Sequence, residues 1–338
     1  KWRPRTLESM VGQDETVRIL TNALQQMRLH HAYLFTGTRG VGKTTLGRIL
    51  TKCLNCETGV TASPCNTCET CIKIDNGQFL DLYEVDAASR TKVEETRELL
   101  DNVCYMPTMG RYKIYLIDEV HMLSSHSFNA LLKTLEEPPP HVKFILATTE
   151  IKRLPATILS RCLQFHLKYI SPEKIAKHLQ HICKTESITY DEAALYKLAE
   201  SAEGSMRDAL SLLDQAIAYG RGTITYADIK TLLGSITQDD LYPLLTALAE
   251  KKGQQLFQHI AAMADKAPDF QQLFTELISL FHKIALAQIM PALETDAAIT
   301  ALARQLKAEE IQFYYQTALL GRRDLAISPN AQQGFEMA

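Results

Sequence analysis

The sequence feature that most constrains the fold is a glycine-rich stretch at residues 37–44, which reads GTRGVGKT. It fits the pattern G-x-x-x-x-G-K-[ST] and lies between a short apolar run and a segment with helical spacing. In this context, the backbone N–H groups of the loop and the positive end of the helix dipole can surround the phosphates of a nucleotide. A glycine-rich turn that matches by chance is the alternative, and the strand-loop-helix pattern argues against it.

The loop predicts a site for ATP and Mg²⁺. Lys43 should reach the β- and γ-phosphates, and the hydroxyl of Thr44 should be a ligand of Mg²⁺. The predicted nucleotide-binding residues of the loop are Gly37, Thr38, Arg39, Gly40, Val41, Gly42, Lys43, Thr44 and Thr45.

A second motif lies at residues 114–119, where a short apolar segment ends in Asp118 and Glu119. The carboxyl ends of parallel strands meet at one edge of a sheet, so these acids should lie beside the phosphate loop. Asp118 would then organise Mg²⁺, and Glu119 would orient the attacking water. The alternative is a purely structural acid pair, which we disfavour because two adjacent buried acids are costly without a cation.

The pattern of apolar residues predicts the fold of the first half of the chain. Strands are predicted at 32–35, 79–85, 113–118 and 142–148, and segments with helical spacing, including 14–27, separate them. Strands that alternate with helices predict an α/β domain with a parallel, helix-covered sheet.

The length of 338 residues exceeds the usual size of one hydrophobic core and predicts two or three domains. Strand signals fade beyond Tyr169, and Ser171 followed by Pro172 is typical of a helix start. Helical patterns at 191–201 and 205–219 predict that the next segment is entirely helical. The predicted domains are an α/β domain at 1–170 with an insert at about 53–75, a helical domain at 171–235 and an all-helical domain at 236–338.

Five of the eight cysteines fall between positions 53 and 71, a clustering that favours metal over disulfides in a cytosolic chain. Cys56, Cys65, Cys68 and Cys71 have the spacing C-x8-C-x2-C-x2-C, and four thiolates can enclose one structural Zn²⁺. Cys53 is an alternative ligand, but it continues the helix that begins at the phosphate loop, so we prefer Cys56. Reduced cysteines without metal remain the other interpretation.

The remaining cysteines, Cys104, Cys162 and Cys183, are predicted to be ordinary small apolar residues.

The formal net charge of −3 argues against a surface coated with basic residues, so any contact with nucleic acid requires a local basic patch. No apolar run approaches the roughly 20 residues of a membrane span, and the first residues lack a secretory signal, which predicts a cytoplasmic protein without membrane partners. The absence of an initiator Met suggests that Lys1 is not the natural start.

Several further motifs carry a resemblance to a known family. They are KWRP at 1–4, VGQ at 11–13, DEVH at 118–121, LKTLEEPP at 132–139, SRC at 160–162 and GSMRD at 204–208, together with the phosphate loop and the cysteine cluster. In this combination, the chain resembles the gamma/tau family of bacterial DNA polymerase III, the ATPases of the clamp loader within the AAA+ superfamily. The resemblance implies an AAA+ ATPase domain with an inserted zinc module, a small helical lid and an all-α oligomerisation (collar) domain.

The resemblance also implies roles that the residues alone do not indicate. Arg161 would be an arginine finger that enters the ATP site of a neighbouring subunit. Arg207 would be the second sensor and Thr149 the first, both responding to the γ-phosphate. Read without the family, these are a solvated or salt-bridged arginine, a helix-surface arginine and a strand-end threonine. Trp2, Pro4 and Val11 would lie near the adenine, although alone they suggest only packing.

The partners implied by the resemblance are other gamma/tau copies, the delta and delta-prime subunits, the sliding clamp and primer-template DNA. The candidate DNA-contacting residues are Arg90, Lys92, Arg97 and Lys133, and scattered solvated charges are the alternative interpretation. Such contacts would be to phosphates, without sequence preference. The expected location is the cytoplasm, at replication forks. The chain stops soon after Phe335, so we expect it to lack the extension of the longer family form.

The function implied is an ATPase motor: ATP binding and hydrolysis would open the sliding clamp and load it onto primed DNA, with no polymerase site in this chain. One alternative is a different AAA+ motor, such as a branch-migration helicase, against which the zinc insert and the helical third domain argue. Another is a scaffold that binds zinc and partner subunits without hydrolysis, against which Lys43, Thr44, Asp118 and Glu119 argue.

Overall fold

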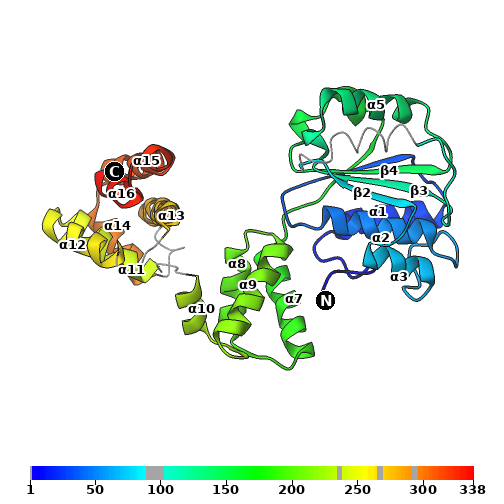
Figure 1. Ribbon diagram of the computed structural model, residues 1–338. Coiled ribbons are helices and arrows are strands. Elements are labelled where there is room, and N and C mark those ends of the chain that lie inside the picture. Colours follow the sequence, from blue (N-terminus) through cyan, green and yellow to red (C-terminus); the bar gives the residue numbers. More distant parts are fainter. Residues whose placement is uncertain (1, 89–102, 234–237, 265–268, 291–295) are drawn as a thin grey trace. The chain divides into compact units, whose positions relative to one another are not determined.

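The computed structural model describes residues 2–88, 103–233, 238–264, 269–290 and 296–338 (Figure 1). The chain divides into two compact units, Lys1–Ile224 and Thr225–Ala338. The predicted candidates Arg90, Lys92 and Arg97 lie outside the described residues.

The first unit is built on a five-stranded parallel sheet with the strand order β2-β3-β4-β1-β5. The strands are β1 (Ala32–Thr36), β2 (Leu82–Asp86), β3 (Lys113–Asp118), β4 (Val142–Thr148) and β5 (Leu163–His166). The predicted parallel sheet is therefore confirmed, although β2 begins three residues later than predicted and β5 was not predicted. In β5 only Phe165 is buried, so this short edge strand has no apolar run that sequence periodicity can detect.

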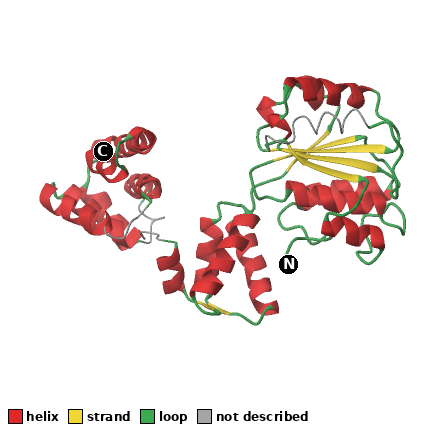
Figure 2. Cartoon of the chain, viewed as in Figure 1, coloured by secondary structure: helices red, strands yellow, loops and turns green. Residues whose placement is uncertain are grey.

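Helices cover both faces of this sheet (Figures 1 and 2). One face carries α1 (Asp14–Gln25), α2 (Lys43–Asn55) and α3 (Glu69–Asn76), and the other carries α5 (Ser125–Glu136). Successive side chains of β3 point to opposite faces of the sheet. Leu116 packs into the core with α2, whereas Tyr115 and Ile117 pack into the core with α5. This alternation is the period-two geometry of a strand buried on both sides.

Three short elements lie in the segments that connect the strands. They are the 3-10 helices η2 (Val120–Met122) after β3 and η3 (Ile151–Arg153) after β4, and the one-turn helix α6 (Ala156–Leu159) before β5. The elements η2 and η3 lie at the carboxyl edge of the sheet, where the phosphate loop also follows β1. The edge therefore gathers residues from several parts of the sequence.

The rest of the first unit contains α7 (Pro172–Thr185), α8 (Glu192–Ser201) and α9 (Met206–Tyr219). The prediction that this segment is entirely helical is wrong, because β6 (Thr189–Tyr190) and β7 (Thr223–Ile224) pair in parallel. A turn with left-handed backbone at Arg221 (φ +51°) and Gly222 (φ +94°) leads the chain from α9 into β7. Strands of two residues are too short to produce a sequence period.

The second unit is helical throughout its described residues. Its elements are α10 (Tyr226–Leu232), α11 (Gln238–Ala249), α12 (Gly253–Ala264), α13 (Phe270–Ile289), α14 (Ala297–Gln305), α15 (Ala308–Asp324), η5 (Leu325–Ile327) and α16 (Ala331–Met337). Its core is centred on α13, which buries Leu280 and Ile284 completely. The unit begins at Thr225, and the predicted domain boundaries at 170 and 235 stay predictions. Among the described residues, none of the helices combines the length and the apolar content needed to cross a membrane.

Candidate active site and metal centre

The phosphate loop connects β1 to α2 and has a conformation that only glycine adopts easily. Gly37 has φ +145° and Gly40 has φ +78°, both in the left-handed region. A Cβ atom on Gly37 would lie 2.6 Å from the carbonyl oxygen of Leu167, and one on Gly40 would collide with the hydroxyl of Ser205. The backbone N–H of Arg207 also donates to the carbonyl of Gly40 at 3.4 Å, so the start of α9 contacts the loop directly.

Lys43 begins α2 and lies across the loop. Its ammonium donates to the carbonyl oxygens of Gly37 at 2.8 Å and Thr38 at 2.9 Å, and the residue is 6% exposed. Burial lowers the pKa of Lys43, whereas the nearby carboxylates of Glu119 and Asp118 oppose this shift. A phosphate placed on the loop would meet this ammonium, because the loop carbonyls already hold it there.

Two acids at the end of β3 face the start of α2. The hydroxyl of Thr44 donates to Oδ2 of Asp118 at 2.5 Å, and the backbone N–H of Glu119 donates to Oδ1 of Asp118 at 3.0 Å. Oε2 of Glu119 accepts hydrogen bonds from both the backbone N–H and the hydroxyl of Thr149, at 3.1 Å and 2.8 Å. The structure therefore brings together four of the predicted site residues from α2, β3 and the end of β4.

The donors of this group fit the predicted Mg²⁺. A hydroxyl and a carboxylate are hard oxygen donors, which are the ligands that Mg²⁺ prefers, usually with several waters and phosphate oxygens completing the set. Thr44 and Asp118 hold such oxygens in direct contact beside the phosphate loop. The residues present therefore suit a magnesium-nucleotide complex.

A cleft of about 1020 Å³ joins these residues to the N-terminal segment and the helices after β5. That volume is in the range of pockets that hold a nucleotide-sized ligand. The predicted residues that line it include Trp2, Pro4, Val11, Arg39, Gly40, Val41, Gly42, Lys43, Thr44, Thr45, Asp118, Glu119 and Arg207. The predicted base-contacting residues thus face the same cavity as most of the phosphate loop, whereas Gly37, Thr38 and Thr149 are not among the residues that line it.

Some residues of the cleft were not predicted. The indole N–H of Trp2 donates to Glu186 of α7 at 2.7 Å, and the Trp2 ring meets that of His181 edge-on, with 6.4 Å between ring centroids. Nε of Arg3 donates to the hydroxyl of Thr45 at 3.1 Å. His178 of α7 also lines the cleft, where burial lowers its pKa. Trp2 and Arg3 belong to the KWRP motif, whereas no motif marks Glu186 or His178, which only the folded arrangement identifies.

Arg161 is not among the residues that line this cleft. It follows α6, and Nη2 lies 2.7 Å from Oε1 of Glu136, while Nη1 donates to the carbonyl of Thr157 at 2.8 Å. The guanidinium is therefore held at the surface by an ion pair and one backbone carbonyl. Lys133, the remaining DNA candidate among the described residues, is exposed on α5, away from the cleft lining.

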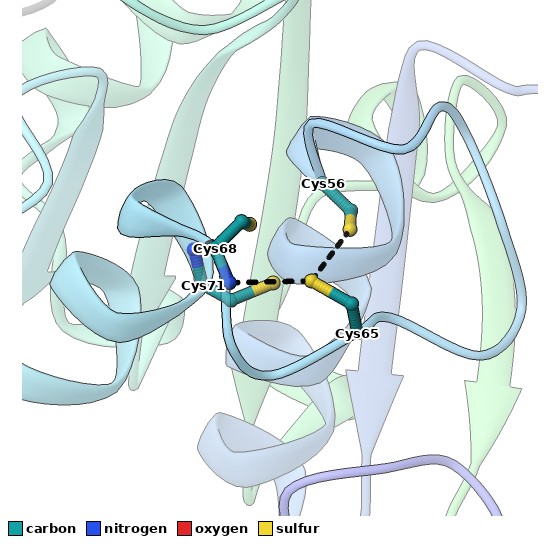
Figure 3. A group of neighbouring side chains, drawn as sticks. All are labelled: Cys56, Cys65, Cys68 and Cys71. Atoms are coloured by element: carbon teal, nitrogen blue, oxygen red, sulfur yellow. Dashed lines mark hydrogen bonds between the residues drawn. The ribbon is translucent and has the colours of Figure 1, made fainter.

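The cysteine cluster lies between the end of α2 and the start of α3 (Figure 3). The sulfur atoms of Cys56, Cys65, Cys68 and Cys71 lie within 4.8 Å of one another. Four sulfurs about 2.3 Å from one Zn²⁺ would be separated by roughly 3.8 Å, which this arrangement accommodates with small adjustments. Cys56 ends α2 as its C-cap and Cys68 is the N-cap of α3, so two helix ends fix the cluster.

Backbone hydrogen bonds favour the thiolate form at two of the four sulfurs, whereas burial raises the pKa of Cys71. Sγ of Cys65 accepts from the N–H of Cys68 at 3.3 Å, and Sγ of Cys68 accepts from the N–H of Cys71 at 3.4 Å. Hydrogen bonds from Thr67 and Cys68 lower the pKa of Cys65 to about 6. A thiol that ionises easily is a good zinc ligand. The chemistry of the four sulfurs therefore fits Zn²⁺.

Cys53 is separate from the cluster. Its Sγ donates to the carbonyl of Ala62 at 3.8 Å, and burial raises its pKa to about 12, as expected of a core thiol. Cys162 and Cys183 are also buried, as predicted. The prediction for Cys104 is wrong, because this residue is exposed in a turn before β3, where a small apolar side chain has no core to enter.

Polar contacts that were not predicted attach the cysteine cluster to the sheet. Lys52 of α2 is 1% exposed, and its ammonium lies 2.8 Å from both the Asn66 side-chain oxygen and Asp75 Oδ1. Arg111, which lies just before β3, donates to the backbone carbonyls of Cys56 and Glu57. A buried ammonium needs such partners, so the cluster and α2 form one connected structure.

Comparisons with known protein families match most of the chain in three segments. Residues 12–171 match a model of the DNA polymerase III delta subunit, and residues 174–222 match the ATPase lid domain of a DNA polymerase III clamp loader subunit. Residues 224–338 match domain III of the DNA polymerase III gamma and tau subunits.

Relatives along the full chain agree with these segments. The chain is 52% identical to the DNA polymerase III subunit tau of Escherichia coli over all of this chain and 53% of that protein. It is 45% identical to the DNA polymerase III subunit gamma of Buchnera aphidicola (subspecies Baizongia pistaciae), over all of this chain and 94% of that protein. The chain therefore spans about half the length of the tau relative and nearly all of the gamma relative.

Among solved structures, the chain is similar to the RuvB Holliday junction branch migration motor of Thermotoga maritima. The TM-score is 0.53 with 19% sequence identity, over 74% of this chain and 80% of that one. A likeness at this level of identity concerns the fold alone, here a parallel α/β sheet domain followed by helices.

Proposed function

This chain belongs to the family of DNA polymerase III gamma and tau subunits, and from that membership we propose that it is the ATPase motor of a sliding-clamp loader. ATP binding and hydrolysis would drive the opening of the clamp and its loading onto primer-template DNA. The observation that carries the proposal is the contact of Thr44 with Asp118 beside Lys43 and Glu119, because these are the phosphate, Mg²⁺ and water ligands that one subunit would contribute to phosphoryl transfer to water.

The chain's own residues would bind and orient the nucleotide. The ammonium of Lys43 would move from the loop carbonyls to the β- and γ-phosphate oxygens, and Thr44 and Asp118 would hold Mg²⁺. Bound Mg²⁺ would neutralise charge that develops on the phosphates. Trp2 and Val11 would enclose the base at the other end of the cleft.

Glu119 would orient the attacking water and accept its proton. Thr149, which donates two hydrogen bonds to one carboxylate oxygen of Glu119, would connect that orientation to the γ-phosphate, in keeping with the predicted first sensor. Arg207 lines the same cleft and is joined to the loop through Gly40, which suits a second sensor that links nucleotide state to the position of α9.

Arg161 would complete the site of a neighbouring subunit. It lies apart from the cleft of its own subunit and would exchange Glu136 for the γ-phosphate of the neighbour. Hydrolysis above the basal rate would then require assembly with other gamma/tau copies and with delta and delta-prime. The subunit would work in the cytoplasm at replication forks, and Lys133 together with residues 90, 92 and 97 would contact DNA phosphates.

The zinc site would be structural, because four cysteine sulfurs leave no position for a substrate. Zn²⁺ held by Cys56, Cys65, Cys68 and Cys71 would fix the end of α2, whose other end carries Lys43 and Thr44. The zinc would therefore support the phosphate site without taking part in its chemistry.

The branch-migration alternative rests on a similar fold alone, since the RuvB likeness has 19% identity, whereas the gamma and tau relatives reach 45% and 52%. The scaffold alternative predicts an incomplete site. Thr44, Asp118 and Glu119 in contact with one another argue for hydrolysis instead.

The test is ATP turnover by the purified chain, alone and with delta, delta-prime, sliding clamp and primed DNA. The expected result is low basal turnover that rises strongly with clamp and primed DNA and falls about 100-fold in Lys43→Ala. Lys177→Ala, which removes an exposed lysine of α7, is the control and should leave turnover unchanged. Turnover that ignores the clamp and the DNA would contradict the clamp-loader function.

A further inference from the structure

Glu119 lies in a network of side chains that extends beyond the groups described above. Its Oε2 accepts the two hydrogen bonds of Thr149, and Nδ1 of His121 lies 3.4 Å from the same oxygen atom. One carboxylate oxygen is thus faced by three groups that come from the ends of two adjacent strands. Because Glu119 also lines the cleft, the way this oxygen is held decides how the carboxylate faces a ligand.

The imidazole of His121 is itself held on both sides. Its side chain is 5% exposed, and Nδ1 lies 2.9 Å from the hydroxyl of Thr148 in β4. Nε2 lies 3.6 Å from Oε1 of Glu150, whose Oε2 is 2.8 Å from Nε of Arg153. A buried ring with a partner at each nitrogen has a fixed orientation, and the network continues from it to the surface at Arg153.

The backbone adds a second observation. Glu119 has φ +46° and ψ +46°, a left-handed conformation that costs a non-glycine residue about 1 kcal/mol or more. The N–H of Met122 donates to the Glu119 carbonyl at 2.8 Å, which closes the turn that carries His121. A strained backbone conformation persists where the surrounding structure holds it, and His121 lies in the turn that follows the strained residue Glu119.

We propose that His121 is a positioning residue that sets the orientation of the Glu119 carboxylate, and that Glu150 helps to hold the His121 ring at Nε2. The inference rests on the proposed function, in which Glu119 orients the attacking water. A glutamate side chain has three rotatable bonds, and a displacement of about 1 Å from the productive geometry can cost about 100-fold in rate. His121 would restrict that freedom without touching the substrate.

The simpler alternative is that His121 only ties the ends of β3 and β4 together. Both readings predict some loss of stability on substitution, so stability cannot separate them. The two interpretations predict different rates of hydrolysis at full nucleotide occupancy. They also differ for the hydrogen bond between Thr149 and Glu119, which a substitution of His121 would leave unchanged if the role were purely structural.

The test uses three variants. His121→Leu removes both ring nitrogens, and His121→Asn keeps a polar group near Nδ1. Glu150→Gln removes the charge of the exposed carboxylate that faces Nε2. ATP turnover is measured in the full assembly with clamp and primed DNA, together with the Kd for ATP and the hydrogen exchange of the Thr149 amide. His141→Leu is the matched control, because His141 lies just before β4, at the opposite end of the strand from Thr148.

For His121→Leu we expect kcat to fall 10- to 100-fold while the Kd for ATP changes less than about twofold. The Thr149 amide should exchange faster, His121→Asn should recover most of the rate, and Glu150→Gln should lower it about two- to fivefold. If kcat and Thr149 exchange stay unchanged in His121→Leu, the proposal is overturned. If the wild-type assembly hydrolyses no ATP but Thr149 exchange responds to His121→Leu, the positioning role stands and the proposed function fails.

Discussion

The hydroxyl of Thr44 donates a hydrogen bond to Oδ2 of Asp118 across 2.5 Å. This contact joins the first turn of α2 to the last residue of β3, and the two residues are 74 positions apart in the sequence. It places the two predicted Mg²⁺ ligands in direct contact, so a bound ion would take the place of a hydrogen bond that already exists.

This contact predicts how Asp118→Asn behaves. The amide keeps the size of the side chain and can still accept from Thr44, but it lacks the charge that holds Mg²⁺. We expect turnover to fall about 100-fold and the Mg²⁺-dependent gain in ATP affinity to disappear, while ATP binding without Mg²⁺ changes little. Calorimetric titrations with and without Mg²⁺ measure this. Asp14→Asn, at an exposed acid paired with Lys174, is the control.

The ion pair between Arg161 and Glu136 predicts a dependence on assembly. Arg161→Ala should lower turnover of the full assembly at least 1,000-fold, because an arginine finger acts on charge in the transition state, while the isolated subunit keeps its basal rate. Arg18→Ala, at an exposed arginine of α1, should change neither rate. An equal loss in the isolated subunit and in the assembly would show that Arg161 does not act between subunits.

Local motifs explain which parts of this site could be predicted. The phosphate loop, the acids after β3 and the four clustered cysteines each have a fixed spacing along the chain, and the structure brings each set together. His121 with Glu150 and Lys52 with Asp75 could not be predicted, because these pairs meet only through strand pairing or helix packing. Short elements such as β5, β6 and β7 were missed because they carry too few residues to define a period.

The cysteine environments predict a pattern of alkylation. Because the pKa of Cys53 is raised to about 12 and that of Cys162 to about 11, both thiols stay protonated at pH 8 and should resist iodoacetamide. The exposed Cys104 should react first. With Zn²⁺ bound, Cys65 should be protected, and a chelator should make it the next to react; mass spectrometry identifies the sites. Cys65 reacting equally with and without chelator would contradict the zinc site.

The pKa of His178 is lowered by burial and, to a smaller extent, by His181. Below an unfolded-state pKa of about 6.5, the unfolded chain therefore binds a proton that the folded chain resists, so stability falls as the pH falls. His178→Gln should reduce this loss between about pH 7 and pH 5. Urea unfolding at several pH values measures the slope. Substitution of His141 by Gln, at a histidine that does not line the cleft, is the control, and equal slopes for both variants would contradict the prediction.

Gly47 predicts how tightly α2 packs on the sheet. A Cβ atom at this position would lie 2.7 Å from Cδ1 of Leu116 and 3.1 Å from Cγ2 of Ile145, so a side chain must push α2 away from β3 and β4. Gly47→Val should destabilise the first unit by about 1–3 kcal/mol through overpacking, and Gly47→Ala by less, because the gain in helix propensity offsets part of the clash. Denaturant unfolding measures both.

The same displacement should reach the phosphate site, because Gly47 lies about one helical turn after Lys43 and Thr44. We therefore expect Gly47→Val to weaken ATP binding about tenfold, whereas Gly253→Ala, at the start of α12 with open space around it, should alter neither stability nor binding by more than about 0.5 kcal/mol. Loss of stability in Gly47→Val with unchanged ATP affinity would mean that the first turn of α2 is held in place from its own loop and by Asp118, independently of how the rest of the helix packs on the sheet.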